Sequence, residues 1–114
     1  MNAHTATPTQ SRLNIDYVQI ESLRLDPTNA RVHSKAQIRQ IARSIEAFQF
    51  NAPVLVDRDN KVIAGHGRVL ACRHLGRSEI PIIRLEHLTP EQALGFAIAD
   101  NRLSETSSWD QSLL

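Results

Sequence analysis

The stretch that decides the fold is Ile63-Ala64-Gly65-His66-Gly67-Arg68, in which an apolar segment runs into a turn framed by two glycines. Residues 69–75 continue with apolar side chains at helical spacing, so the turn joins a strand to a helix. The first N–H groups of such a helix have no partner within it and point toward the turn. The stretch therefore predicts an anion-binding turn, which we interpret as the floor of a phosphate or nucleotide site.

Upstream of the turn, the sequence predicts a strand, a turn and a long helix. Residues 17–20 alternate as a short strand, and Asp26-Pro27-Thr28-Asn29 has the composition of a turn. Ser34 and Gln37 form a capping box, after which apolar residues recur at helical spacing as far as Phe48. This segment is the clearest helix in the chain.

The remaining segments complete a small α+β domain. Two short apolar segments, residues 54–56 and 62–64, flank a polar turn and predict a hairpin. Residues 81–85 predict another strand, and Thr89 with Gln92 forms a second capping box that starts the last helix. The order predicts a mixed sheet of about four strands packed with three to four helices.

The 114 residues allow one domain. Residues 1–16 are rich in polar residues without an apolar period, and we expect a disordered tail there. We place the domain at 17–107 and interpret 108–114 as the start of a following helix or a linker, and we leave open whether the natural chain continues past Leu114.

Composition restricts the classes of function. No stretch approaches the roughly 20 apolar residues of a membrane span, and the first residues lack the apolar segment of a signal peptide, so we expect a cytoplasmic protein without membrane contact. The net charge is only +1, but residues 24–84 carry eleven basic against five acidic side chains. A basic body attracts anions such as nucleotides or DNA, and a solvated mixed surface is the alternative interpretation.

Cysteine and histidine usage argues against disulfide and metal sites. Cys72 is the only cysteine, so it has no partner for an internal disulfide and supplies no pair for zinc. The five histidines show no pairing on one helical turn. We therefore assign no metal ligands to the protein.

Two side chains in the turn, those of Arg68 and His66, are candidates to contact a phosphate group. Arg68 offers a forked, charge-assisted contact to phosphate oxygens. His66 has an ordinary pKa of about 6.5, so it serves either as a neutral hydrogen-bond partner or as a cation beside a phosphate, and it is our candidate catalytic residue. Glycine-flanked turns between strands and helices are common, and a purely structural turn remains the alternative.

Three further groups of residues are candidates. Asn29 and Arg31 lie before the capped helix, where binding residues are often displayed. Asp100 and Asn101 lie on the last helix. The capped helix also carries a basic stripe, which is a candidate contact to DNA phosphates or simply a solvated face, formed by Lys35, Arg39 and Arg43.

Taken together, these motifs resemble the N-terminal domain of the ParB/sulfiredoxin superfamily, the ParB-like nuclease domain. The resemblance covers roughly residues 18–105 and is closest to the ParB-like domains found with phage and plasmid DNA methyltransferases, in which turns such as Gly-His-Gly-Arg and endings such as Asp-Asn-Arg-Leu-Ser-Glu are familiar. It rests on the Asn-Ala-Arg loop, the capped helix, the strand at 53–56, the Gly65 turn, the strand at 80–82 and the helix at 98–101.

The resemblance implies a nucleotide site for CTP or ATP with Mg²⁺. In partition proteins of this family, the segments matching Asn29 to Arg31 and Gly65 to Arg68 hold the triphosphate, and the helix matching Asp100 and Asn101 completes the site. His66 departs from the pattern, because it replaces the acid of partition proteins and the cysteine of sulfiredoxins. Cys72 lies two helical turns further on, where we expect a buried core residue, so the chain is not a sulfiredoxin.

Gly67 replaces a basic residue of the family pattern. We expect this change to weaken triphosphate binding by the value of one charge-assisted contact, about 1.5–3 kcal/mol. Partition proteins read DNA with a helix-turn-helix domain that follows this one. DNA is therefore an expected partner, directly or through a fused or separate helix-turn-helix domain or methyltransferase, and a homodimer is left open.

The sequence leaves three functions open. The first is a nucleotide-binding module linked to DNA modification, segregation or transcription control. The second is an enzyme: a nuclease, although the carboxylates are dispersed in sequence, or a slow nucleoside triphosphatase in which His66 or Asn101 positions water. The third is a DNA-binding or protein adaptor domain that needs no nucleotide.

Overall fold

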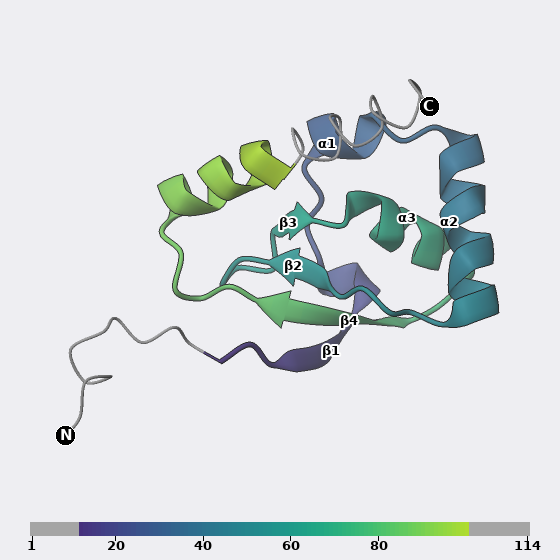
Figure 1. Cartoon of the computed structure of the whole chain (residues 1–114), viewed down its shortest axis with the longest axis horizontal. Helices are drawn as coiled ribbons and strands as arrows, with labels where there is room; N and C mark the ends of the chain where they lie inside the picture. The colour runs from purple at the N-terminus through teal and green to yellow at the C-terminus, as the bar shows by residue number, and fades with distance from the viewer. Residues whose placement is uncertain (1–11, 101–114) are drawn as a thin grey trace, which may run out of the picture.

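Four strands form one mixed sheet in the computed structural model, which describes residues 12–100 (Figure 1). The strands are β1 (Ile15–Gln19), β2 (Val54–Val56), β3 (Val62–Ala64) and β4 (Glu79–Arg84), arranged in the order β1-β4-β2-β3. β1 runs antiparallel to β4, β2 runs parallel to β4, and β2 and β3 form the expected antiparallel hairpin. The predicted α+β class with a mixed four-stranded sheet is confirmed.

The helices are α1 (Pro27–Arg31), α2 (Lys35–Phe48), α3 (His66–His74) and a helix over residues 90–100, with a single 3₁₀ turn, η2 (Ile20–Ser22), after β1. α2 and α3 pack against each other beside the sheet, and α1 lies next to α3 (Figure 1). Among residues 12–100, no helix has both the length and the apolar character needed to cross a bilayer.

Both predicted capping boxes form. The Gln37 N–H donates to Ser34 Oγ at 3.1 Å while the Ser34 N–H donates to Gln37 Oε1 at 3.0 Å. Thr89 and Gln92 make the same reciprocal pair at the start of the helix over 90–100, with distances of 2.9 and 3.1 Å. Each box supplies partners for helix-start amides, which explains why these two helix starts were predictable.

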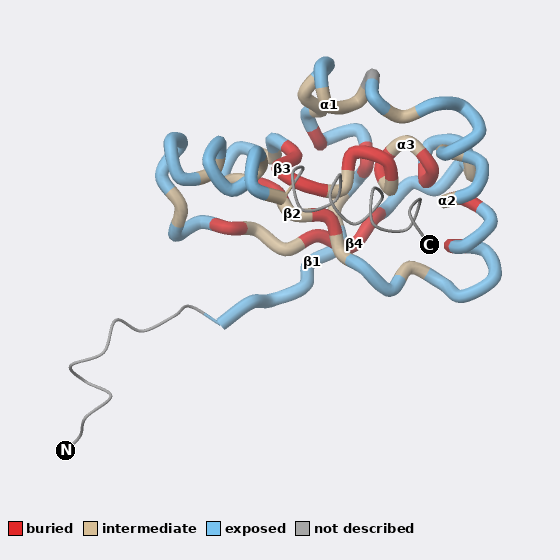
Figure 2. Tube along the Cα trace, turned by 45° about the horizontal axis from the view of Figure 1, so that its top comes forward, coloured by how far each residue is buried: buried red, intermediate tan, exposed pale blue. Residues whose placement is uncertain are grey.

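The core lies between one face of the sheet and the helices α2 and α3. The strand register places alternate residues of β2 and β4 on that face, and burial is concentrated along the central strands and α3 (Figure 2). The largest side chains that are completely shielded from solvent there are Val54, Val56, Ile80, Ile82, Val69 and Cys72. Helix α3, which starts with the Gly65 turn, is therefore fixed by the best-packed part of the molecule.

The structure corrects the sequence prediction in the segment before α2. Residues 26–29 do not form a turn, because Asp26 is the N-cap of α1 and its carboxylate accepts the Thr28 N–H at 2.9 Å. Pro27 occupies the first helical position, where the missing N–H and the fixed φ of proline do not destabilise the helix, because an N–H there has no partner within the helix. Asn29 and Arg31 therefore belong to a short helix rather than to a loop.

Two strands also differ in their limits from the predicted ones. β1 begins at Ile15 rather than at residue 17, and β4 covers Glu79–Arg84 rather than 81–85. The N-terminal tail as far as residue 11, Asn101, and residues 102–114 lie outside the described residues.

Candidate anion-binding site at the start of α3

Gly65 is the N-cap of α3 and adopts φ 103° and ψ 23°, a conformation that side chains rarely tolerate. Its carbonyl accepts the Val69 N–H at 3.1 Å and so begins the helix. The three amides between these residues, those of positions 66 to 68, have no carbonyl partner within the helix. The turn therefore presents helix-start N–H groups of the kind that bind anions.

The Arg68 side chain folds back over this turn. A Cβ placed on Gly65 would lie 3.0 Å from Arg68 Nη2 and 3.2 Å from Val54 Cγ2. Gly65 is thus needed for two reasons, its backbone conformation and the space that the guanidinium occupies. Arg68 Nη2 donates to the Pro53 carbonyl at 3.2 Å, which holds the guanidinium beside the turn rather than in bulk water.

The guanidinium of Arg68 has a donor that no described residue uses. Its Nε is buried and has no hydrogen-bond partner among the described residues. Burial lowers the pKa of Arg68, and the Asp100 carboxylate opposes that shift, which places Asp100 within electrostatic reach of the guanidinium. A buried donor without a partner is costly, so Arg68 is a candidate to bind an acceptor that the described residues do not supply.

His66 points into the protein. Only 5% of the residue is exposed, and its Nε2 accepts the backbone N–H of Asp26 at 3.3 Å. Burial lowers the pKa of His66, and His33 and Lys61 lower it further, while Asp26 acts in the opposite direction. The hydrogen bond accepted by Nε2 and the lowered pKa both favour the neutral ring. This hydrogen bond connects the start of α1 to the start of α3. A role in positioning water would have to use Nδ1, because Nε2 is already engaged.

Gly67 faces a neighbouring helix. A Cβ at this position would lie 2.9 Å from Ile41 Cδ1 and 3.0 Å from His33 Cε1. The close approach of α3 to α2 and His33 therefore requires a residue without a side chain. The family resemblance predicts the loss of one phosphate contact at Gly67, and the packing supplies a separate physical reason for glycine there.

The structure brings together several of the segments predicted to form the site. α1, which carries Asn29, contacts α3, and the hydrogen bond from Asp26 to His66 joins their first turns. Asp100 is near Arg68 at the end of the described helix over 90–100. Segments on either side of residue 65 that are far apart in the sequence thus meet around the Gly65 turn. Asn101, the remaining residue predicted for the site on the last helix, lies outside the described residues.

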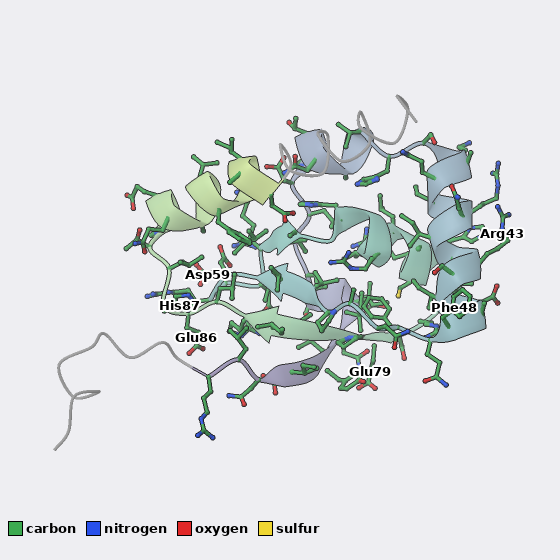
Figure 3. All side chains as sticks on the ribbon, in the orientation of Figure 1. Arg43, Phe48, Asp59, Glu79, Glu86 and His87 are labelled. Carbon is green, nitrogen blue, oxygen red and sulfur yellow. The ribbon has the colours of Figure 1, made fainter. Side chains whose placement is uncertain are left out.

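The basic stripe is separate from the turn. Lys35, Arg39 and Arg43 are all exposed on α2, and Arg43 projects from α2 away from α3 (Figure 3). This surface and the Gly65 turn are distinct features, so substitutions in one are usable as controls for the other.

Cys72 is completely shielded from solvent in the core, and burial raises the pKa of its thiol. The expectation of a buried core cysteine is confirmed. Within residues 12–100, no group of three or more His, Cys, Asp or Glu side chains is arranged to hold a metal ion.

Sequence reasoning missed three contributors to this region: Asp26, His33 and the Pro53 carbonyl. Asp26 was detectable, because an N-cap residue followed by proline is a helix-start signal. His33 packs on Gly67 and the Pro53 carbonyl holds Arg68. These two contacts depend on tertiary packing and leave no local pattern in the sequence.

Comparison with known proteins identifies the class to which this fold and turn belong. The sequence matches the family described as ParB N-terminal domain over residues 4–102, so the chain belongs to that family. It is 42% identical over 81 residues to the ParB-like nuclease domain-containing protein YnaK of Escherichia coli K12, an alignment that covers 71% of this chain and 93% of that protein.

Solved structures share the fold at low sequence identity. The chromosome-partitioning protein ParB of Caulobacter crescentus, solved in complex with CTP-γ-S, superposes with a TM-score of 0.67 at 23% identity, over 77% of this chain and 52% of that one. The chain thus spans about half the length of that structure. Sulfiredoxin from Arabidopsis thaliana matches with a TM-score of 0.62 at 17% identity, over 75% of this chain and 97% of that one. The ParB/sulfiredoxin fold is confirmed.

Proposed function

We propose that this domain binds CTP or ATP, with Mg²⁺, at the Gly65 turn and acts as a nucleotide-binding module linked to DNA modification, segregation or transcription control. The observation that carries the proposal is the Arg68 guanidinium, which lies against the turn with a buried Nε that has no partner among the described residues. Helix-start amides and a guanidinium at one point are donors that suit phosphate oxygens.

The roles of the residues follow from their positions. The amides of Gly67 and Arg68, at the start of α3, donate to phosphate oxygens, and the Arg68 guanidinium adds a charge-assisted contact. α1, with Asn29 and Arg31, borders the nucleotide on one side, and Asp100 borders it on the other. The family resemblance also assigns Asn101, which lies outside the described residues, to this site. Mg²⁺ would arrive with the phosphates, whose charge it partly neutralises, and we assign it no protein ligand. In support, the Caulobacter ParB that shares this fold was solved with a CTP analogue.

Titration calorimetry with CTP, ATP and GTP in the presence of Mg²⁺ tests the proposal. We expect heat for at least one nucleotide. Arg68→Ala should lower the affinity by about tenfold to a hundredfold, since a hydrogen bond to a charged group contributes about 1.5–3 kcal/mol. Arg68→Lys keeps the charge but removes Nε, and we expect it to bind more weakly than the wild type.

Arg39→Ala is the matched control, because it removes one arginine from the exposed stripe on α2 and should leave nucleotide affinity unchanged. Circular dichroism of each variant separates loss of binding from loss of folding. The absence of heat with every nucleotide at about 1 mM would refute the proposal, since the free energy of binding would then be weaker than about −4 kcal/mol.

The link to DNA is a second part of the proposal. The stripe of Lys35, Arg39 and Arg43 is suited to backbone phosphates, which give affinity but no sequence specificity. Sequence reading would then come from a fused or separate helix-turn-helix domain or DNA methyltransferase. Measuring DNA affinity at several salt concentrations tests the stripe: Arg39→Ala should reduce the slope of log affinity against log salt, and an unchanged slope would remove DNA contact from this surface.

A further inference from the structure

His66 is buried at the point where α1 meets α3. Only 5% of the residue is exposed, and its Nε2 accepts the backbone N–H of Asp26, the N-cap of α1, at 3.3 Å. Because Nε2 is the acceptor, the proton of the neutral ring is on Nδ1. The neutral form of His66 therefore connects the Gly65 turn to the start of α1.

α1 depends on its contacts with the rest of the protein for its position. It has five residues, which is too short for a helix that is stable by itself. It lies against α3 (Figure 1), but residues 27–30 are exposed or half-buried, so they bury little apolar surface. Segments with few buried apolar contacts are the ones that open locally. Loss of the hydrogen bond at the N-cap should therefore loosen α1.

A protonated His66 is incompatible with this hydrogen bond. Nε2 would carry a proton and would face the Asp26 N–H, donor against donor. The charges of described residues that act on the ring are those of Asp26, of His33 between α1 and α2, and of Lys61 before β3. The Asp26 carboxylate attracts a cation here, but it already accepts the Thr28 N–H at 2.9 Å, and the other two groups repel a cation. A proton on His66 therefore requires the ring or α1 to move.

We infer that His66 is a positioning residue that makes nucleotide binding at the Gly65 turn depend on pH: its neutral ring holds α1 beside the turn, and a proton on the ring releases α1 and lowers the affinity for the nucleotide. The inference rests on the proposed function, because it concerns regulation of the same site. When only a fraction of the molecules has α1 in place, the apparent affinity is reduced by that fraction. By linkage, the proton and the nucleotide then oppose each other's binding.

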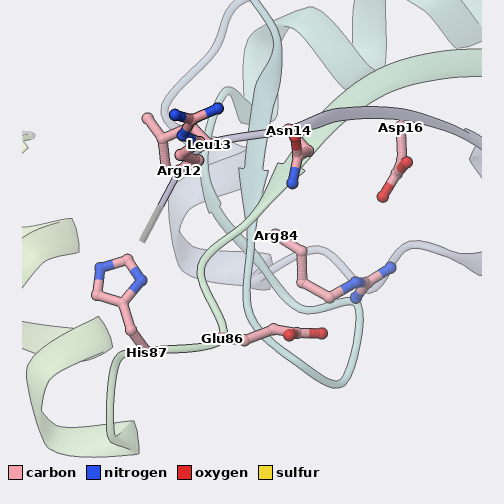
Figure 4. Close-up of a pocket in the computed structure, with 7 residues that line it drawn as sticks. All are labelled: Arg12, Leu13, Asn14, Asp16, Arg84, Glu86 and His87. Carbon is pink, nitrogen blue, oxygen red and sulfur yellow. The ribbon is translucent and has the colours of Figure 1, made fainter. Parts of the chain in front are cut away.

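Two other histidines are on the surface and provide matched controls. His74 is exposed at the end of α3, and His87 is exposed after β4, where it lines a pocket of about 180 Å³ with Arg12 and Arg84 (Figure 4). Neither is among the described groups whose charge acts on His66. His74→Gln and His87→Gln should therefore leave the pH dependence of nucleotide binding as it is in the wild type.

NMR spectra of the nucleotide-free full chain test the role of the hydrogen bond. A titration from about pH 8 to about pH 4.5 follows the His66 ring and the Asp26 amide together. Burial lowers the pKa of His66, so we expect both signals to change with one midpoint below about 6.5, the Asp26 amide proton moving upfield. His66→Gln, whose Oε1 can accept the same N–H without titrating, should leave the Asp26 amide unchanged over this range. An Asp26 amide that does not follow the His66 ring in the wild type would overturn the positioning role.

Titration calorimetry with CTP or ATP and Mg²⁺ tests the regulation. From about pH 7.5 to about pH 5, the affinity of the wild type should fall about twofold to tenfold, the range that corresponds to one lost hydrogen bond. His66→Gln should bind like the wild type at the higher pH and show no such fall. This variant also corrects for titration of the nucleotide and its Mg²⁺ complex. His66→Leu, which has no acceptor, should bind at the higher pH as weakly as the wild type does at the lower one.

The outcomes separate this inference from the proposed function. A wild-type affinity that rises as the pH falls would indicate a cationic His66 in direct contact with phosphate and would overturn the inference. A wild-type affinity that is constant, or that falls equally in His66→Gln, would also overturn it. The absence of binding at every pH would refute the proposed function and the regulation with it, while the Asp26 amide would still show whether His66 holds α1.

Discussion

Replacing Gly65 by alanine should destabilise the protein more than any other single methyl added at a glycine with positive φ among the described residues. At φ 103° and ψ 23°, a residue with a side chain is strained by about 1–3 kcal/mol. The new methyl would also lie 3.0 Å from Arg68 Nη2 and 3.2 Å from Val54 Cγ2, and crowding of this kind costs about 1–3 kcal/mol more. We expect a total loss of about 3 kcal/mol.

Gly76→Ala is the matched control. Gly76 also has a positive φ, 73°, but nothing lies within 4 Å of its added Cβ. Gly76→Ala should therefore lower the free energy of unfolding only by the cost of backbone strain, about 1–2 kcal/mol. Since 1 kcal/mol corresponds to about 4–8 °C in Tm for a domain of this size, thermal unfolding followed by circular dichroism resolves the two variants.

The double variant Gly65→Ala with Arg68→Ala separates strain from crowding. Removing the guanidinium takes away the closest contact of the new methyl group. Gly65→Ala should therefore lower the free energy of unfolding less in the Arg68→Ala background than in the wild type. If Gly65→Ala were no more destabilising than Gly76→Ala, the packing of Arg68 over the turn would be refuted.

Four further outcomes are expected. Gly67→Ala should cost about 1–3 kcal/mol in chemical denaturation, and Ile41→Val should recover part of this loss by removing the Cδ1 atom that the new methyl meets; no recovery would contradict the packing account. The lowered pKa of His66 means that the unfolded state binds its proton first, so the free energy of unfolding should fall as the pH drops below about 6.5, and His66→Gln should flatten that part of the profile. Cys72 should react with a thiol reagent only under unfolding conditions, whereas rapid labelling of the native protein would place it at the surface. Gly95→Ala, within the helix over 90–100 and with open space at its Cβ, should raise the free energy of unfolding by about 0.5–1 kcal/mol.

The elements that local patterns encode were predictable from the sequence. The capping boxes at Ser34 and Thr89 fixed two helix starts, and the polar turn between residues 56 and 62 fixed the hairpin. The Gly65 turn was predictable for the same reason, since a strand, a glycine and a helix are adjacent in the chain. In each case the physical determinant lies within a few residues of the feature it produces.

Features that depend on distant segments were not predictable. The hydrogen bond from the Asp26 amide to His66 joins residues 40 positions apart, and the contact of Gly67 with Ile41 and His33 exists only after α2 and α3 pack. α1 was missed for a different reason. Asp, Pro and Asn favour turns as well as helix starts, and here the N-cap of Asp26 decides in favour of the helix.

The central claim is that the amides at the start of α3 and the Arg68 guanidinium bind the phosphates of a nucleotide. Amide NMR spectra recorded during a titration with CTP and Mg²⁺, and then with ATP and Mg²⁺, test it most directly. The account predicts that the largest shifts, for at least one nucleotide, occur at the backbone amides of residues 65–68 and at Arg68 Nε. Shifts confined to other surfaces, or spectra unchanged by either nucleotide, would contradict it.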